Sequence, residues 1–479
     1  MIPLTSRQLA QVVDGTLVGD ADRVVDGGVV TDSRLAGPGS LYVARRGENA
    51  DGHDFVEGAL AHGAVLTLAE REVPGDHVLV ADTQEAFVRL ARWMVDELPD
   101  LQVVAVTGSS GKTSTKDLLG QVLAEAGETI APIESYNSEV GVPLTVCRLE
   151  PTTQYLVAEM GASGPGHIAY LTAVVPPRVG IVLNVGSAHI GGFGSQQGIA
   201  DTKAAIVEDL PADGLAVLNA DDPLVAAMAQ RVRSGAVQTF SLDPERAAAD
   251  ESVTAWAEGL ELDEAGRARF TVALRPAAGD PQAVERHAVH LRVRGAHMAA
   301  NALAVLLAVR HVGVPVADAV AALGRAEAVS RWRMEVTDRP DGVMVINDGY
   351  NANPESMRAA LTALGDMAHG RRTWAVLAGM LELGEASEAR HRELGRAAAE
   401  RGIDVVVVVG DTARPVADGV HDFTADTGQD GPEVVIATDS QEARTMLEER
   451  LRPGDVVLFK SSRDSGMRVL GDQVAGVVA

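Results

Sequence analysis

The sequence has one cysteine, Cys147, among 479 residues, which excludes an internal disulfide and a multi-cysteine metal site. Such scarcity is typical of a reducing compartment. Aromatic residues make up only 3% of the chain, so the cores must be built from Val, Leu, Ala and Ile. Basic residues are also few, since 41 Lys and Arg stand against 67 Asp and Glu, a net charge of −26. This balance argues against a nucleic-acid partner, because phosphate backbones are bound by clustered basic side chains.

Long apolar stretches are missing as well. The valine run at 405–409, one of the longest, is far shorter than the ~20 residues that span a bilayer. The first residues, MIPLTSRQLAQVVDG, lack a basic region followed by an apolar one, so no export signal is expected. We therefore expect a cytoplasmic protein without membrane insertion.

The length predicts about three domains, at roughly 100–200 residues per domain. Residues 1–98 carry short strand-like runs and close with a helical segment. Residues 99–328 open as a βα unit and become alternating, and therefore antiparallel, between about 240 and 294. Residues 329–479 again alternate strands with helices. We expect an α/β protein with a small N-terminal α/β domain, a central mainly parallel sheet with appended antiparallel strands, and a C-terminal Rossmann-like domain.

The strongest chemical signal is VTGSSGKTSTK at residues 106–116, between an expected strand and an expected helix. Gly108 and Gly111 let the backbone approach phosphate oxygens, and the amides at the helix start favour an anion. Lys112 can reach the β- and γ-phosphates, and Thr113 can ligate Mg²⁺. The common GxxxxGK[ST] pattern needs a glycine where this chain begins with valine, and no guanine-reading NKxD motif is visible. The compact form therefore disfavours GTPases and ordinary P-loop kinases.

Polar residues follow the expected strands at the edge of the sheet where this loop lies. Glu159 is the best candidate for an oxygen ligand of Mg²⁺. His189 follows another strand by a few residues, and its chemistry alone fits a structural hydrogen-bonding role as well as a ligand. Asp221 and Asp222 are expected mainly as turn or helix-capping residues. Lys203 lies early in a helix, where lysines are usually solvated, but burial would lower its pKa and let the neutral amine take up CO₂ as a carbamate.

Together, these segments resemble the Mur ligase family over nearly the whole chain. TDSR at 31–34 and GSLYVARRGENADGHDF at 39–55 are similar to the family's uridine-nucleotide domain. EMGASGPGHI, NVGSAHIGGFGS and the Lys203 helix follow in the family's order, and GAHMAANALA at 295–304 leads toward the last domain. SYNSEVGVPLT at 135–145, with YNANP and MLELG, resembles the branch that adds D-alanyl-D-alanine to UDP-N-acetylmuramoyl-tripeptide.

The resemblance implies an ATP-dependent ligase that forms an amide through an acyl phosphate in peptidoglycan precursor synthesis. The implied cofactors are ATP, two Mg²⁺ ions and CO₂ held as a carbamate on Lys203. The implied partners are UDP-N-acetylmuramoyl-tripeptide and D-alanyl-D-alanine, and the chain is expected to be a monomer. Its domains would bind the UDP precursor (1–98), ATP (99–328) and the amine substrate (329–479), the last closing on ATP.

The resemblance also assigns roles to individual residues. The catalytic set is Lys112, Glu159, His189 and Lys203, with Thr113, Glu159 and His189 as metal ligands. The ATP-binding set is Thr107, Gly108, Ser109, Ser110, Gly111, Lys112, Thr113, Ser114, Asn301, Arg333 and Asp348. The UDP-precursor set is Thr31, Asp32, Ser33, Arg34, Asn137 and Ser138, and Asn351 and Asn353 lie on the amine-substrate side.

Some positions depart from the family's pattern. Ala204 stands where Glu is frequent, Ser138 where Asn is common, Asn347 where Asp is common, and Gly379 replaces an acidic residue. Two alternative functions remain open. A sibling Mur ligase or a folylpolyglutamate synthetase shares the compact phosphate loop, although YNANP, MLELG and TDSR favour the branch above. An ATP-gated binding protein would hydrolyse ATP without forming an amide.

Overall fold

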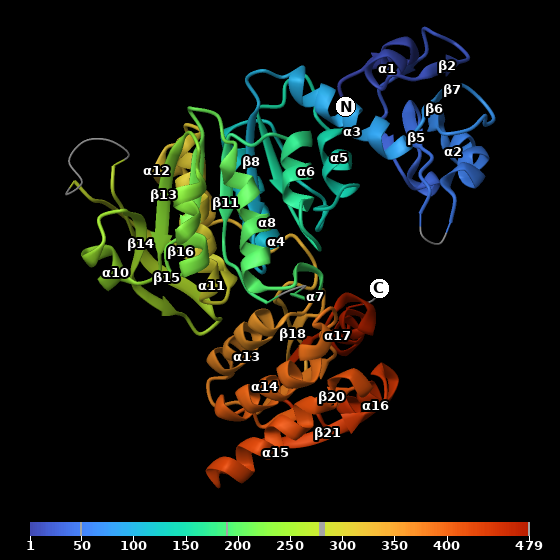
Figure 1. Ribbon diagram of the computed structural model, residues 1–479. Coiled ribbons are helices and arrows are strands. Elements are labelled where there is room, and N and C mark those ends of the chain that lie inside the picture. The colour runs from blue at the N-terminus through green and yellow to red at the C-terminus, as the bar shows by residue number, and fades with distance from the viewer. Residues whose placement is uncertain (48–49, 188–189, 277–282, 478–479) are drawn as a thin grey trace.

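The structure is a computed structural model that describes residues 1–47, 50–187, 190–276 and 283–477. The chain forms an N-terminal, a central and a C-terminal domain, each built on its own β-sheet (Figure 1). The N-terminal and C-terminal domains attach to different sides of the central domain. The expected α/β fold class is therefore confirmed, whereas the boundaries at about 98 and 328 stay predictions.

The N-terminal domain is a small sheet flanked by helices. Its elements are β1 (Leu4–Thr5), α1 (Ser6–Val12), β2 (Thr16–Val18), β3 (Val24–Val25), β4 (Val29–Val30), the 3₁₀ turn η1 (Ser33–Leu35), β5 (Ser40–Val43), η2 (Gly52–Phe55), α2 (Val56–His62), β6 (Ala64–Ala69), β7 (His77–Leu79) and α3 (Thr83–Asp96). The main sheet has the order β2-β7-β6-β5-β4, with β2 antiparallel to its neighbour. A small antiparallel pair, β1-β3, lies beside it.

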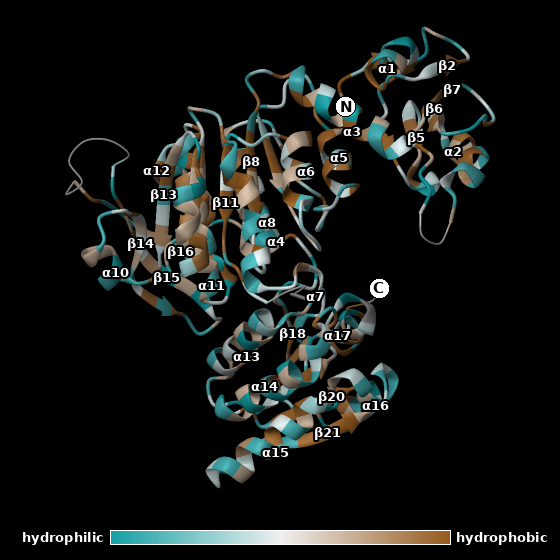
Figure 2. Ribbon diagram, in the orientation of Figure 1, coloured by the Kyte–Doolittle hydropathy of each residue, from teal (hydrophilic) through white to brown (hydrophobic). Residues whose placement is uncertain are grey.

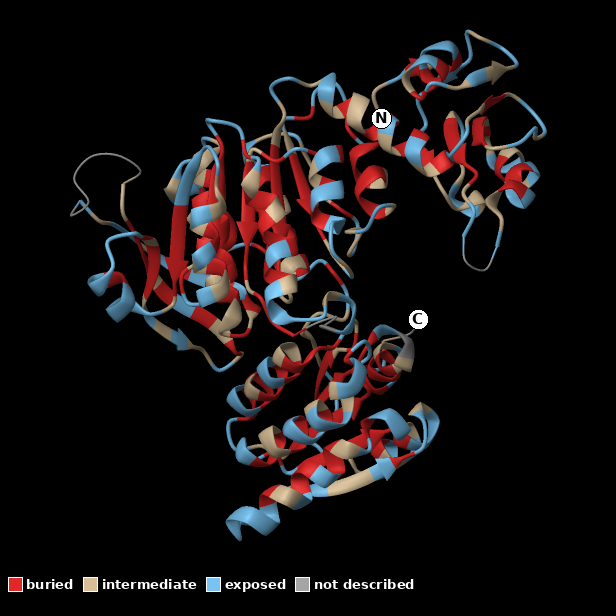
Figure 3. Ribbon diagram, in the orientation of Figure 1, coloured by how far each residue is buried: buried red, intermediate tan, exposed pale blue. Residues whose placement is uncertain are grey.

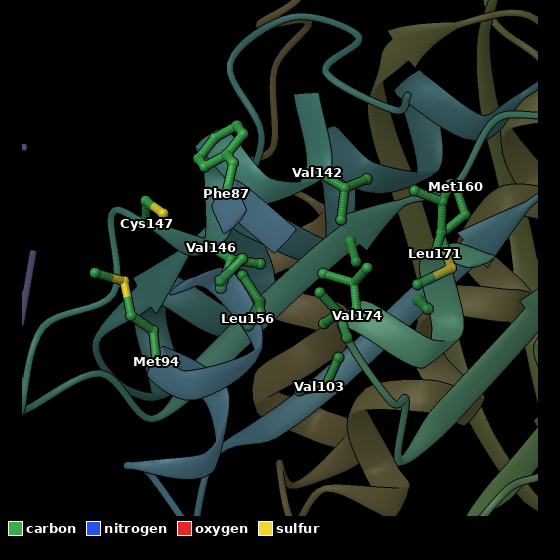
Figure 4. Packing of buried hydrophobic residues seen from close by; sticks show 14 of the residues in the cluster. Phe87, Met94, Val103, Val142, Val146, Cys147, Leu156, Met160, Leu171 and Val174 are labelled. Carbon is green, nitrogen blue, oxygen red and sulfur yellow. The ribbon is translucent and has the colours of Figure 1, made fainter. Parts of the chain in front are cut away.

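Helix α3 joins the N-terminal domain to the central domain. The Asp82 side chain caps the helix by accepting a hydrogen bond from the Glu85 amide. Its buried face, which includes Phe87 and Met94, lies among side chains of the central domain such as Val146 (Figure 4). The two domains therefore share one hydrophobic core at this junction.

The central domain carries the long sheet. Its elements are β8 (Gln102–Thr107), α4 (Lys112–Ala126), β9 (Thr129–Ile130), α5 (Gly141–Val146), β10 (Tyr155–Glu159), α6 (His167–Val174), β11 (Val179–Val182), α7 (Ile190–Phe193), α8 (Gln196–Glu208), β12 (Leu215–Asn219), α9 (Pro223–Ala226), the 3₁₀ turn η3 (Ala227–Arg231), β13 (Ala236–Ser241), α10 (Pro244–Ala249), β14 (Val253–Leu262), β15 (Arg267–Leu274), β16 (Glu285–Arg294), α11 (His297–His311) and α12 (Val316–Leu323). The order is β16-β15-β14-β13-β12-β11-β8-β10-β9. Strands β8 to β14 are parallel, and β15 and β16 are antiparallel. The antiparallel strands expected between about 240 and 294 are therefore confirmed for β15 and β16, whereas β14 pairs in parallel with β13.

The register of this sheet assembles the candidate site. Strand β8 lies between β10 and β11, with Val106 paired to Glu159 and Thr107 paired to Val182. The three strands therefore end at the same edge, where parallel α/β sheets commonly bind ligands. The phosphate loop leaves β8 at this edge.

The C-terminal domain is a second, mainly parallel sheet. Its elements are β17 (Glu335–Asp338), β18 (Met344–Asp348), α13 (Pro354–Ala368), β19 (Thr373–Ala378), the 3₁₀ turn η4 (Gly384–Ala386), α14 (Ser387–Glu400), β20 (Val405–Val409), η5 (Asp411–Ala413), α15 (Pro415–Thr427), β21 (Glu433–Ala437), α16 (Ser440–Arg450), β22 (Val456–Lys460), η6 (Arg463–Ser465) and α17 (Met467–Ala475). The order is β17-β18-β22-β19-β20-β21, with β17 antiparallel. The alternation of strands and helices expected for residues 329–479 is confirmed.

Apolar residues concentrate on the inner strands of the central and C-terminal sheets, and these strands are buried (Figures 2 and 3). Helices α13, α14 and α15 pack on one face of the C-terminal sheet, and α16 and α17 pack on the other. In the described ranges, no helix is both long enough and apolar enough to cross a bilayer.

The segment that links the central and C-terminal domains is anchored on the central side. Ser330 donates from its amide and its hydroxyl to the two carboxylate oxygens of Asp117, at 3.0 and 3.1 Å. Trp332 and Met334 then adopt left-handed φ angles of 58° and 52°, which are costly for bulky residues. The chain direction at this junction is therefore fixed by contacts on the helix α4 that begins at the phosphate loop.

Candidate functional site

The phosphate loop joins β8 to α4 and depends on two glycines. Gly111 has φ of 80°, a left-handed conformation that glycine adopts without strain. A Cβ atom on Gly108 would lie 2.9 Å from the Ser110 carbonyl oxygen, so a side chain would not fit there. The amides in the first turn of α4 have no helical acceptor, and they point along the positive end of the helix dipole. The loop is therefore suited to an anion.

Asn184, which follows β11, holds the two serines of the loop. Its side-chain oxygen accepts from the Ser110 amide at 2.9 Å, and its side-chain nitrogen donates to the Ser110 carbonyl oxygen at 3.2 Å. The Asn184 carbonyl oxygen accepts from the Ser109 amide at 3.1 Å. The Ser109 and Ser110 amides are therefore already hydrogen-bonded within the protein. An anion would bind to the amides at the start of α4 instead. Sequence reasoning missed Asn184, because no local pattern marks it.

Glu159 lies fully buried at the end of β10, beside the first turn of α4. Its Oε1 accepts from the side-chain nitrogen of Asn137 at 2.6 Å and from the Thr113 hydroxyl at 3.3 Å. The Thr113 hydroxyl also lies 2.8 Å from that of Ser135. Its Oε2 has no hydrogen-bond partner among the described residues. A buried carboxylate oxygen without a partner is costly, and this arrangement suits a cation bound beside Thr113.

Two buried lysines face the same cavity. Lys112 Nζ donates to the Gly108 carbonyl oxygen at 2.7 Å, and burial lowers the pKa of Lys112 while the Glu159 carboxylate opposes the shift. Lys203, on α8, is 4% exposed. Burial, together with the charge of Lys112, lowers the pKa of Lys203 well below its usual range. Lys203 therefore lies in the site, although a lysine on a helix is usually exposed to solvent.

The C-terminal domain contributes paired charges to the cavity. Arg333 stacks on the Tyr350 ring at 4.1 Å and donates to the Ser135 hydroxyl of the central domain at 2.8 Å. Asp348, at the end of β18, forms a 2.6 Å ion pair with the buried Lys460 at the end of β22. Both predicted nucleotide contacts, Arg333 and Asp348, therefore lie on the wall that faces the phosphate loop.

The start of α13 reaches the phosphate loop itself. Asn353 caps this helix by accepting from the Ser356 amide at 2.8 Å, and its side-chain nitrogen donates to the Ser109 carbonyl oxygen at 3.1 Å. Glu355 accepts from the Ser187 amide at 3.0 Å and from the Ser187 hydroxyl at 2.9 Å. The amine-substrate role predicted for Asn353 stays a prediction, and its side chain is engaged on the ATP side in this arrangement.

One cavity of about 670 Å³ lies between the central and C-terminal domains, and it is lined by the phosphate loop, both lysines, Glu159 and Asn353 but not by Glu355 or Ser187. The predicted site residues along its wall are Gly108, Ser109, Ser110, Gly111, Lys112, Thr113, Ser114, Asn137, Ser138, Glu159, Lys203, Asn301, Arg333, Asp348, Asn351 and Asn353. Thr107 lies behind the wall, where its hydroxyl donates to the Met160 carbonyl oxygen at 2.8 Å. The predicted metal ligand His189 lies outside the described residues.

The predicted uridine-nucleotide residues Thr31, Asp32, Ser33 and Arg34 lie in the N-terminal domain and are not part of this cavity in the described structure. Asp32 caps η1 and pairs with Arg34 at 2.6 Å. The hydrogen bonds from Arg34 lower the pKa of Asp32 to about 2. The nearby Tyr42 hydroxyl donates to the Gly52 carbonyl oxygen at 2.8 Å. This group is a second, separate candidate site.

Sequence reasoning also missed His297 and Lys460. His297 begins α11 and lines the cavity, and burial lowers the pKa of its imidazole. Lys460 pairs with Asp348 across neighbouring strands 112 positions apart in the chain, and no local pattern marks such a pair. By contrast, the turn and capping roles expected for Asp221 and Asp222 are confirmed, because Asp221 lies in the turn after β12 and Asp222 caps α9.

Three of the four departures from the family's pattern have local physical explanations, and the structure offers none for Ser138. Asn347 donates to the buried Asp472 carboxylate at 3.0 Å, where an aspartate would bring two carboxylates together. A Cβ atom on Gly379 would lie 2.8 Å from the Thr412 methyl carbon, so a larger residue would clash there. Ala204 is fully buried, and a glutamate would place a charge in the core.

The loop, the buried carboxylate and the two lysines lie on one cavity that a second α/β domain completes. They define a class of multidomain phosphate-loop proteins whose C-terminal domain contacts the loop. Three family models match this chain. The model described as Mur ligase family, catalytic domain, matches residues 27–110, the Mur ligase middle domain matches 106–309, and the Mur ligase, glutamate ligase domain, matches 332–463.

Individual proteins give the same result. UDP-N-acetylmuramoyl-tripeptide--D-alanyl-D-alanine ligase from Mycobacterium leprae is 40% identical, with 99% of both chains covered. A crystal structure of MurF from Acinetobacter baumannii has a TM-score of 0.85 and 29% identity, with 99% of both chains covered. The structure of MurF ligase from Thermotoga maritima in complex with ADP has a TM-score of 0.76 and 29% identity, with 94% of this chain and 97% of that one covered. The chain belongs to the Mur ligase family.

The buried amine of Lys203 predicts a pH-dependent penalty on stability. Its pKa is lower in the folded state than the unfolded value of 10.5, so between the two values the unfolded chain binds more protons and stability rises with pH. In CO₂-depleted buffer, we expect Lys203→Met to raise the melting temperature at pH 7 by about 2 °C or more, with a smaller gain at pH 10. Scanning calorimetry measures both values. A gain that is equal at the two pH values would contradict a neutral buried lysine.

Proposed function

We propose that this protein is an ATP-dependent ligase that adds D-alanyl-D-alanine to UDP-N-acetylmuramoyl-tripeptide in peptidoglycan precursor synthesis. The observation that carries the proposal is the 40% identity, across 99% of both chains, to a relative with that name. The cavity supports it, because the phosphate loop and the YNANP segment at 350–354 line the same space. The acidic chain would act in the cytoplasm as a monomer.

ATP would bind with its phosphates at the start of α4 and its base toward Asn301. Asn301 is buried, and its side-chain oxygen would lie only 3.1 Å from a Cβ atom at Gly111, which places it against the loop. Lys112 holds the Gly108 carbonyl oxygen in this arrangement, and its flexible stem allows it to turn toward the β- and γ-phosphates. Arg333 and Asp348 would complete the nucleotide site from the C-terminal domain.

The residues around Glu159 fit one Mg²⁺ ion. The vacant Oε2 of Glu159 and the Thr113 hydroxyl are oxygen donors of the kind that Mg²⁺ prefers, together with water and phosphate oxygens. When bound, Mg²⁺ supplies positive charge that offsets the charge of the phosphates. A second Mg²⁺, with His189 as a ligand, belongs to the same proposal. Among the described residues, no group of three or more Asp, Glu, His or Cys side chains is placed to hold a metal ion, so water and phosphate oxygens would supply the other ligands.

Lys203 would carry a carbamate. A neutral lysine amine attacks CO₂, forming an N–C bond and releasing one proton, and the product is an anion. Burial lowers the pKa of Lys203 and so increases the share of neutral amine. The resulting anion would face Lys112 and would turn a repulsive lysine pair into an attractive one.

The reaction would proceed in two steps within this cavity. A carboxylate oxygen of the tripeptide attacks the γ-phosphorus of ATP, which gives an acyl phosphate and releases ADP. The free amine of D-alanyl-D-alanine then attacks the acyl carbon, and phosphate leaves as the amide forms with loss of a proton. Lys112 offsets the charge of the oxygens that approach one another, and the C-terminal domain keeps water from the acyl phosphate.

A donor panel tests the proposal. The protein would be incubated with ATP, UDP-linked tripeptide (with either meso-diaminopimelate or L-lysine) and one amine among D-alanyl-D-alanine, L-alanine, D-glutamate and L-glutamate. We expect mass spectrometry to show an amide product only with D-alanyl-D-alanine. A product with another amine would indicate a sibling ligase, and ATP hydrolysis that never yields an amide would indicate an ATP-gated binding protein.

Lys112→Ala tests the role of the phosphate loop. We expect turnover to fall by ~10²–10³, the scale for loss of a preorganised electrostatic contact. The exposed Asp366→Asn on α13 serves as a control and should leave turnover unchanged. Near-normal ADP release by Lys112→Ala would refute the assignment of this lysine.

Glu159→Gln tests the proposed Mg²⁺ ligand. The variant keeps an oxygen for the Asn137 contact but loses the carboxylate charge, so the Mg²⁺ concentration for half-maximal ADP release should rise roughly 10–100-fold. A Mg²⁺ titration at saturating ATP measures this shift. An unchanged Mg²⁺ requirement with lower turnover would exclude Glu159 as a ligand.

Isotopic labelling tests the carbamate. After equilibration with ¹³C-bicarbonate, we expect a carbamate carbonyl resonance in the wild-type protein and none in Lys203→Met. A spectrum without that resonance in the active wild-type protein would end the carbamate proposal.

A further inference from the structure

The first turn of α13 contacts the central domain through Glu355, to which no role has been given so far. One carboxylate oxygen of Glu355 accepts both the amide and the hydroxyl hydrogen of Ser187, at 3.0 and 2.9 Å. A Cβ atom on Gly186 would lie 2.8 Å from the Glu355 carboxyl carbon. The contact therefore depends on a glycine at 186, which lets the carboxylate approach the backbone closely.

The segment that Glu355 contacts is bonded to the phosphate loop. The Gly186 amide donates to the Ser109 hydroxyl at 2.9 Å, and Ser109 belongs to the loop. From the other side, Asn353 donates to the Ser109 carbonyl oxygen at 3.1 Å. The first turn of α13 therefore reaches Ser109 twice, directly through Asn353 and indirectly through Glu355 and Gly186.

The Glu355 contact has a built-in cost. Its second oxygen, Oε2, is buried and has no hydrogen-bond partner in the described part of the chain. The cost of desolvating this unpaired oxygen offsets much of the free energy gained from the two hydrogen bonds. The N-terminus of α13 favours a negative charge at this position and reduces that cost. A joint of this kind adds little net stability. It is suited to an interface that forms and separates repeatedly.

We propose that Asn353 and Glu355 form a catch that couples closure of the C-terminal domain to the geometry of the phosphate loop. Glu355 is a positioning residue in this catch. It fixes the segment 184–187, and through Ser109 it fixes the loop in the shape that binds ATP. The inference rests on the proposed function, because it requires ATP at this loop.

Three variants test the catch. Glu355→Ala removes both hydrogen bonds to Ser187, and Glu355→Gln keeps an acceptor oxygen but removes the charge. Asp366→Asn is a matched acidic change at an exposed position of the same helix. We expect kcat/KM for ATP to fall about 10- to 100-fold in Glu355→Ala and less in Glu355→Gln, as for two hydrogen bonds to a charged group. Asp366→Asn should behave as the wild-type protein.

Domain closure provides a readout that a local packing role would not change. Small-angle X-ray scattering with Mg²⁺ and a non-hydrolysable ATP analogue gives the radius of gyration of the nucleotide-bound protein. We expect a larger radius for Glu355→Ala than for the wild-type protein, with an unchanged melting temperature. Equal radii together with an equal KM for ATP would overturn the catch.

A double-mutant cycle with Ser187→Ala tests whether the coupling is direct. Since both changes remove the same hydroxyl–carboxylate contact, the double variant should lose little more kcat/KM than Glu355→Ala alone. Fully additive losses would show that Glu355 acts elsewhere.

The failure of the catch can be told from the failure of the proposed function. If the wild-type protein forms no amide in the donor panel, the proposed function fails, and the scattering comparison still decides the catch. If the wild-type protein forms the amide and Glu355→Ala keeps the wild-type radius and KM, only the catch is overturned.

Discussion

The phosphate loop can present the first turn of α4 to an anion because Asn184 holds the two serines that precede it. Its side chain bonds both the amide and the carbonyl oxygen of Ser110, and its own carbonyl oxygen bonds the Ser109 amide. A flexible glycine-rich turn would otherwise lose entropy each time it ordered around a ligand. Since Asn184 follows β11, the neighbour of β8, the parallel sheet itself sets the shape of the loop. The glycines allow the backbone conformation of the loop, and the hydrogen bonds of Asn184 stabilise it.

The charges around this loop are incompletely paired, and that incompleteness is informative. Asp348 and Lys460 satisfy one another at 2.6 Å, as expected for a buried ion pair. Lys112 and Lys203 are instead buried with lowered pKa values, and Glu159 keeps one oxygen without a hydrogen-bond partner among the described residues. Such an arrangement is unfavourable in the protein alone. It becomes favourable once phosphate and Mg²⁺ add opposite charges, so part of the affinity for ATP would come from relief of this cost.

Local patterns predicted much of the fold, because strand periodicity, glycine turns and helix spacing are written within short stretches of sequence. The loop at 106–116, the strand that ends at Glu159 and the antiparallel addition followed from such patterns. Strand β21 was not foreseen, since it lies at the sheet edge and is only partly buried, which weakens its apolar signal. The contact of Glu355 with Ser187 joins residues 168 positions apart, and no single-sequence pattern records such a pairing. The resemblance supplied the role of Lys203, whereas its burial required the three-dimensional structure.

The proposed closure and the chemistry would be joined through the linker between the central and C-terminal domains. The linker is anchored by Ser330 to Asp117 on α4, and the first turn of α13 returns to Ser109 at the opposite end of the loop. Helix α4 and its loop are therefore held at both sides by the C-terminal domain. In the proposed closure, a C-terminal domain that rotates about the first anchor would reach the loop at the second, so closure and the final shape of the loop would arise in one movement. An acyl phosphate is destroyed by water, and an enzyme that forms it only after closure limits that loss. The same geometry that brings the amine substrate near would thus delay phosphoryl transfer until the cavity is covered.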